Sequence, residues 1–179
     1  MDLPTLQVLV TEHVARAPEV ARHAGLPEQI AEEAASRCPD DQAAACKLAR
    51  FLAGVGFRES ALSWLFLTAD GHGEDLHGWD EWQVDDRSHP AEVEEIRALP
   101  PRSPERRRVA LHHGCTVLLA ALDEFPGNDE AGLCRYNASR GLVLKGLIEG
   151  DPNQYTTGHN YGRDVLRWIG ERWTASPSL

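Results

Sequence analysis

The densest group of residues that could carry out chemistry lies between Asp70 and Trp82, in the run DGHGEDLHGWDEW. Histidines and carboxylates of this kind are the nitrogen and oxygen ligands that zinc, manganese or iron takes in proteins. The ligands considered for such a metal site are His72, His77, Asp70 and Glu74. However, His72 and His77 are five residues apart in a glycine-rich run, a spacing that does not place two ligands on one helical face. We therefore expect a solvated acidic loop whose two tryptophans fold back onto the core, with a metal site as the alternative.

Two tryptophans in the same loop, Trp79 and Trp82, indicate a contact surface for another protein. Aromatic side chains are enriched at the centres of protein interfaces. If the acidic loop exposes both rings, it suits a partner that carries a basic and apolar face. The expected partner surface comprises His72, His77, Trp79, Trp82, Arg102, Arg106 and Arg107.

The arginines of this surface surround the start of a strongly predicted helix. Ser103 is a suitable N-cap, and Pro104 suits the first helical position. A helix N-terminus attracts anions, and guanidinium groups bind phosphate well. The basic cluster consists of Arg102, Arg106, Arg107 and Arg108. The alternative to an anion site is an exposed face on which these arginines pair with Glu92, Glu94, Glu95 or Glu105.

Other catalytic arrangements have less support. His112 and His113 are adjacent on the same predicted helix, so their side chains point about 100° apart and cannot hold one metal ion as a pair. Cys115 lies one turn from His112, but on an apolar stripe, where a thiol is buried and inert. The HExxH, GxSxG, GxGxxG and P-loop motifs are absent from the sequence. We assign no catalytic residue and expect no cofactor, although a pocket that joined His72 and His77 to this helix would favour an enzyme.

Composition and charge set the broad class. The chain has 179 residues, 42% of them hydrophobic and 26% charged, as in a folded domain. A net charge of −10 disfavours nucleic-acid and anionic-membrane binding. No signal peptide and no apolar run of about 18 residues is evident, so we expect a cytoplasmic protein. The four cysteines form no CxxC pair and are expected to be reduced.

Helical periodicity predicts an all-α fold of about seven helices packed as antiparallel helical hairpins, with a long irregular acidic loop near residues 70–102. One hairpin is predicted from a helix after Asp41 that ends near Val55, a turn at Gly54 and Gly56, and a second helix over residues 58–69. Further helices are expected at 91–99, from Pro104, at 129–149 and from Tyr161. We expect one domain over residues 1–179, with a cap of short helices at 1–38 and a main body at 40–174.

Two resemblances accompany this pattern. The hairpin residues Leu48, Ala49, Leu52, Ala61 and Leu65 resemble the tetratricopeptide pattern, in which small residues let paired helices touch. A second resemblance is to an uncharacterised bacterial all-helical family, which carries no activity to transfer. It is carried by Phe51-Leu52-Ala53, Arg58-Glu59, Ala61, Trp64, Ser103-Pro104-Glu105, Arg107 and Ala110.

Three functions are compatible with these features. We favour a protein-binding or adaptor module that uses the acidic Trp/His loop as its partner surface. The first alternative is a small helical enzyme, with or without a bound metal, that uses the histidines and carboxylates of residues 70–89. The second is an acidic inhibitor or immunity-type protein that blocks a basic site on another enzyme.

Overall fold

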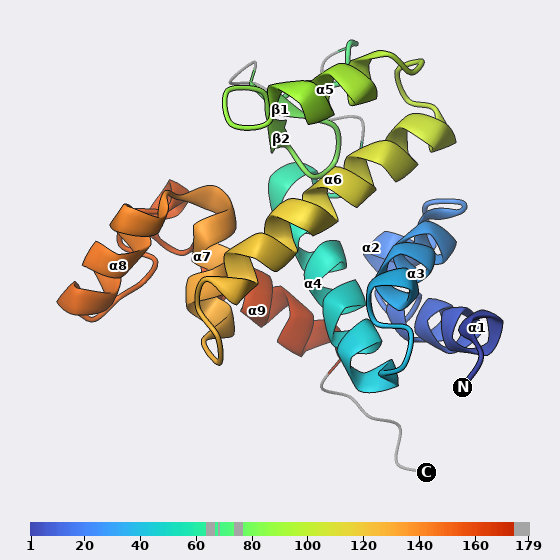
Figure 1. Ribbon diagram of the computed structural model, residues 1–179, viewed down its shortest axis with the longest axis horizontal. Coiled ribbons are helices and arrows are strands. Elements are labelled where there is room, and N and C mark those ends of the chain that lie inside the picture. Colours follow the sequence, from blue (N-terminus) through green and yellow to red (C-terminus); the bar gives the residue numbers. More distant parts are fainter. Residues whose placement is uncertain (64–66, 68, 74–76, 174–179) are drawn as a thin grey trace. The chain divides into compact units, whose positions relative to one another are not determined.

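The computed structural model describes residues 1–63, 67, 69–73 and 77–173, and it is mostly helical (Figure 1). Within these ranges there are nine α-helices and one two-stranded sheet. The prediction of an all-α fold is therefore confirmed. The chain divides into two compact units, residues 1–114 and 115–179, which are described separately below. The expected single domain, with its cap at 1–38 and body at 40–174, stays a prediction.

Four helices form the first part of the first unit: α1 (Leu3–Val14), α2 (Pro18–Ala21), α3 (Leu26–Arg37) and α4 (Gln42–Ser60). Helices α1, α3 and α4 pack against one another (Figure 1). Asp2 and Asp41 cap α1 and α4, and each accepts a hydrogen bond of 2.9 Å from the backbone N–H three residues ahead. The interior between these helices is apolar and includes the buried side chains of Leu6, Val10, Ile30, Ala34, Ala49 and Leu52.

Helix α4 is longer than the sequence predicts. It runs through Gly54 and Gly56 to Ser60, so the turn predicted at these glycines is wrong. The tetratricopeptide-like character stays a prediction. Ala61 ends the helix in the left-handed conformation, with φ of 52°. Residues 61–63 do not continue the helix, and 64–66 and 68 of the predicted second helix lie outside the described residues. A glycine costs a helix only about 1 kcal/mol relative to alanine, so two glycines need not end one.

The region near residues 70–102 contains a short hairpin that the sequence did not indicate. Strand β1 (Gly78–Trp79) pairs antiparallel with β2 (Val84–Asp85), with Trp79 opposite Val84. Asp80 and Gln83 form the connecting turn with φ of 53° and 49°. Strands of two residues are too short to show an alternating pattern in sequence. The predicted helix at 91–99 is present as α5 (Pro90–Arg97).

Trp82 lies at the tip of this hairpin and is fully buried in the first unit. Its indole Nε1 donates a hydrogen bond of 3.0 Å to the Leu52 carbonyl oxygen on α4. Helix α6 (Pro104–Asp123) begins where the sequence predicts, and its residues up to Gly114 belong to this unit. A Cβ atom on Gly114 would lie 2.7 Å from Trp82 Cβ, and one on Gly56 would lie 3.2 Å from Trp82 Nε1. Glycines on α4 and α6 therefore make the space that the indole fills.

The second unit comprises the end of α6, α7 (Asp129–Asn137), α8 (Arg140–Glu149), a 3₁₀ turn (Thr157–His159) and α9 (Tyr161–Trp173). The prediction of one helix over 129–149 is wrong, because the chain leaves the helical conformation at Ala138. Ser139 then caps α8 by accepting a hydrogen bond from the Leu142 N–H. Helix α9 agrees with its prediction: its buried residues include Tyr161, Val165, Trp168, Ile169 and Trp173.

Among the helices of the described residues, none is long and apolar enough to cross a membrane. None of the four cysteines forms a disulfide. The cytoplasmic location stays a prediction.

Substituting Gly114 with alanine tests the packing of Trp82. Alanine normally favours a helix over glycine by up to about 1 kcal/mol, but here the new methyl group would overlap a fully buried indole. We expect Gly114→Ala to lower the free energy of unfolding by about 1–3 kcal/mol. The matched control is Gly170→Ala on α9, where a Cβ meets no atom within 4 Å and which should be neutral or stabilising. Equal effects of the two substitutions in urea denaturation would contradict this packing.

Candidate functional site

Arg106 on α6 forms a buried ion pair with Asp80 in the hairpin turn. Arg106 Nε donates to Asp80 Oδ2 at 2.6 Å, and the two side chains are 2% and 1% exposed. The same guanidinium donates to the Asp70 carbonyl oxygen at 2.6 Å and to the Leu99 carbonyl oxygen at 3.4 Å. One side chain thus joins α6 to three points in the region of residues 70–99, where the sequence predicted solvent-exposed residues.

Arg107 repeats this arrangement with the next acid in the chain. Its Nε donates to Glu81 Oε1 at 2.7 Å, and the Glu81 side chain is 1% exposed. The Glu81 carbonyl oxygen accepts a hydrogen bond of 3.0 Å from the Ser60 hydroxyl at the end of α4. Two consecutive arginines therefore pair with two consecutive acids and hold the hairpin turn against α4 and α6.

Burial, rather than the ion pair, dominates the ionisation of Asp80. It raises the pKa of Asp80 to about 6, while the hydrogen bond from Arg106 and its charge oppose this rise. Because this pKa is higher in the folded than in the unfolded state, the contribution of Asp80 to stability is largest at low pH. That contribution decreases as the pH rises through about 6.

The structure buries both tryptophans, in agreement with a loop whose two tryptophans fold back onto the core. The exposed Trp79 and Trp82 that the partner surface required are not found. Trp79 is 7% exposed and Trp82 is not exposed at all. The Trp79 ring packs against the guanidinium groups of Arg97 and Arg106, at 5.0 and 5.7 Å from the ring centroid. The His72 ring meets the Trp79 ring edge-on at 5.4 Å. Arg106 is likewise buried, where it pairs with Asp80, so it is not part of an exposed surface.

The loop residues considered for a metal site make other contacts. His72 Nδ1 lies 3.1 Å from the Gly73 carbonyl oxygen, and His77 Nδ1 lies 2.9 Å from Asp86 Oδ1. The Asp70 carbonyl oxygen accepts from Arg106, and Glu74 lies outside the described residues. Among the residues that are described, no three histidine, cysteine, aspartate or glutamate side chains are grouped so that they could hold a metal ion.

His112 and His113 line a separate groove of about 350 Å³ between α3, α5 and α6. His112 Nδ1 lies 3.2 Å from Glu33, and His113 Nε2 lies 2.9 Å from Glu95. Neither His72 nor His77 is among the described residues that line this groove. The convergence of the four histidines that would favour an enzyme is therefore not found.

A pocket of about 520 Å³ at the start of α6 brings together cationic side chains from distant parts of the sequence. We call it the basic pocket; its described lining residues are Arg22, His23, Ala24, Ser63, Arg102, Pro104 and Arg107. Arg102 and Arg107 were predicted from the arginine cluster, but Arg22 and His23 were not. About 80 residues separate them from Arg102, and no local pattern could connect them. Arg108, the last member of the cluster, instead pairs with Glu32 at 3.5 Å, a partner that the sequence did not suggest.

The electrostatic environment of His23 shows that the basic pocket is positive. Arg22 Nε donates to His23 Nε2 at 3.3 Å, so the ring accepts at this nitrogen and carries its proton on Nδ1. Burial lowers the pKa of His23, and the charges of Arg22 and Arg107 lower it further. Within the described residues, no carboxylate pairs with Arg22 or Arg102. The pocket therefore has positive charge that is not compensated locally.

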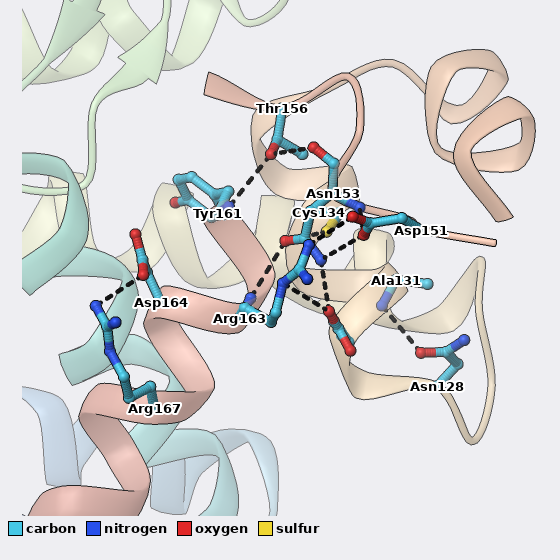
Figure 2. Close-up of polar contacts among 11 residues, drawn as sticks. Asn128, Ala131, Cys134, Asp151, Asn153, Thr156, Tyr161, Arg163, Asp164 and Arg167 are labelled. Carbon is cyan, nitrogen blue, oxygen red and sulfur yellow. Dashed lines mark hydrogen bonds and ion pairs between the residues drawn. The ribbon is translucent and has the colours of Figure 1, made fainter. Parts of the chain in front are cut away.

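The second unit contains a polar cluster around Asn153, which is fully buried (Figure 2). Asn153 Oδ1 accepts from Cys134 Sγ at 3.3 Å and from the Arg163 N–H at 3.2 Å. Its Nδ2 donates to Glu130 Oε1, and Arg163 Nη2 donates to Asp151 Oδ2 at 2.6 Å. Burial raises the pKa of the Cys134 thiol to about 11, which makes it a poor nucleophile. The cluster joins α7, the turn after α8 and the start of α9, and its role is structural.

Replacing Arg106 with methionine tests the ion pair. Without the guanidinium, Asp80 remains buried and charged at pH 8, whereas it takes up a proton at pH 5 because its pKa is already raised to about 6. We expect Arg106→Met to lower the free energy of unfolding by about 3–5 kcal/mol at pH 8 and by less at pH 5. Urea denaturation at both pH values measures the difference.

The control for this experiment is Arg108→Met, on the same helix. It removes an ion pair in which both side chains are 56% exposed, so it should change stability by less than about 1 kcal/mol at either pH. If Arg106→Met lowers the free energy of unfolding equally at pH 5 and pH 8, the buried charge of Asp80 is not the cause of the loss.

Two asparagines of the second unit provide a matched comparison (Figure 2). Asn153→Ala removes a fully buried amide that holds Cys134, Glu130 and the Arg163 N–H together, and we expect it to cost about 2–4 kcal/mol. Asn128→Ala removes only the cap of α7, the hydrogen bond from the Ala131 N–H, and should cost about 1 kcal/mol. Similar melting temperatures for the two variants would rule out the structural role given to the cluster.

Comparison with known proteins adds no family. The sequence matches no protein-family model, and a search of curated proteins finds no significant match. A function must therefore be inferred from the geometry of the chain itself.

Proposed function

We propose that this protein is a non-catalytic binding module that recognises an acidic group on a protein partner through the basic pocket. The observation that carries the proposal is the grouping of Arg22, His23, Arg102 and Arg107 around one pocket. This grouping occurs in a chain whose net charge is −10. Like charges repel, so gathering Arg22 and Arg102, neither of which pairs with a carboxylate of the described residues, beside Arg107 is costly unless an anion binds there.

The position of the basic pocket strengthens its attraction for anions. Pro104 begins a helix of 20 residues, and the positive end of the helix dipole lies at that terminus. Arg107 is held in place by its buried partner Glu81, so this part of the pocket does not have to be ordered when a ligand binds. Arg22 and Arg102 are exposed to solvent, where a partner can reach them.

This proposal keeps the adaptor role expected from the sequence and changes the chemistry of the partner. A partner with a basic and apolar face would require Trp79 and Trp82 on the surface. Their burial favours recognition through Arg102 and Arg107, two members of the expected surface that line the basic pocket. The partner surface would then be acidic.

The alternatives find less support. The small helical enzyme required His72 and His77 to lie with His112 or His113, and the described residues place these side chains in different contacts. The acidic inhibitor rests on the net charge alone, which many proteins share.

A fluorescein-labelled hexaglutamate peptide tests the proposal by fluorescence anisotropy. We expect the wild-type protein to bind it at low salt and to release it as the ionic strength rises. The double variant Arg22→Gln/Arg102→Gln should bind at least about ten-fold more weakly, because hydrogen bonds to charged groups are lost. The control, Arg108→Gln/Arg167→Gln, changes the net charge equally at exposed arginines outside the pocket and should bind as the wild type does. Equal binding by the two double variants would exclude the basic pocket.

A further inference from the structure

The charge of the basic pocket can be counted from its described residues. Arg107 and Glu81 form a buried pair and together carry no net charge. His23 is neutral near pH 7, because burial and the neighbouring arginines lower its pKa. Arg22 and Arg102 remain, so the pocket carries a charge of about +2. A single carboxylate would neutralise only half of this charge.

We infer that the basic pocket binds a phosphomonoester group on a segment of the partner protein, such as a phosphorylated serine. This inference rests on the function proposed above and specifies the acidic group. A phosphoserine carries a charge of about −1.5 to −2 at pH 7 and three strong acceptor oxygens. This charge matches that of the pocket, whereas a glutamate carries −1.

The arrangement of the donors also suits a phosphoryl group. Guanidinium groups donate two parallel hydrogen bonds to phosphate oxygens, and the two exposed arginines approach the pocket from different segments of the chain. Arg22 donates to His23, which restricts its guanidinium before any ligand arrives. Arg102 follows Pro100 and Pro101 and has φ of 62°, so the backbone that carries it is restrained as well.

The pocket is large enough for this group and for part of the chain that carries it. Its volume of about 520 Å³ falls in the range of ligand sites in proteins, about 300–1,000 Å³. A phosphoryl group fills only part of that space. The remainder can hold neighbouring residues of a partner peptide, which gives the peptide an advantage over a free phosphomonoester.

Three fluorescein-labelled nonapeptides of the same glycine- and alanine-rich sequence test the inference, with phosphoserine, glutamate or serine at the centre. We expect the phosphoserine peptide to bind the wild-type protein at least about ten-fold more tightly than the glutamate peptide, and the serine peptide not to bind. Arg22→Gln and Arg102→Gln should each weaken the phosphoserine peptide about ten-fold. Arg108→Gln, which lies outside the pocket on the same helix, should leave its affinity unchanged.

The possible results separate this inference from the proposed function. If the phosphoserine and glutamate peptides bind with equal affinity and Arg102→Gln binds both more weakly, the pocket does not select a phosphomonoester. The proposed recognition of an acidic group would then still stand. Failure of every peptide, hexaglutamate included, would overturn both. If free O-phosphoserine binds as tightly as the phosphoserine peptide, the ligand is a small phosphomonoester. The inference that a partner protein carries the phosphoryl group would then be wrong. Because Arg22 and Arg102 are exposed, thermal melting should show that the variants remain folded.

Discussion

Two adjacent arginines on α6 face two adjacent acids in the hairpin turn, and the structure of the first unit depends on this double ion pair. Arg106 and Asp80 are almost completely buried, as are Arg107 and Glu81. Removing four charged groups from water costs several kcal/mol per ion, and only close pairing with further hydrogen bonds offsets that cost. Arg106 meets this condition with two backbone carbonyl oxygens, so a long irregular segment acquires a defined position.

The same pairing determines which residues remain available for binding. Arg106 is confined to the interior, where its guanidinium also packs against Trp79. Arg107 lies between the interior and the basic pocket, since it holds Glu81 and lines the pocket as well. Two carboxylates of the acidic loop, Asp80 and Glu81, are thus paired in the interior. The surface at the start of α6 is positive, because Arg22 and Arg102 reach it there.

The parts of the fold that depend on local signals could be predicted from the sequence. Asp41, Ser103 and Asn128 cap the helices that follow them, and α5, α6 and α9 lie at their predicted positions. One error comes from packing between distant residues. Gly56 was interpreted as a turn, although its lack of a side chain serves the packing of Trp82, 26 positions later. The break before α8 was missed, although the cap that forms it, Ser139, is a local feature.

The candidate site was only partly predictable for the same reason. The arginine cluster was found because helix caps and helix termini are local features. Arg106 and Arg107 of this cluster are buried because they pair with Asp80 and Glu81. Arg22 and His23 join the basic pocket only because the fold brings them there. Spacing alone contains neither piece of information.

Arg106 and Asp80 stabilise the protein through each other, and a double-mutant cycle measures this coupling directly. The unfolding free energies of the wild type, Arg106→Met, Asp80→Leu and the double variant would be determined at pH 8. A coupling energy above about 2 kcal/mol, with the double variant more stable than either single one, is predicted. Additive losses, with a coupling near zero, would contradict the account.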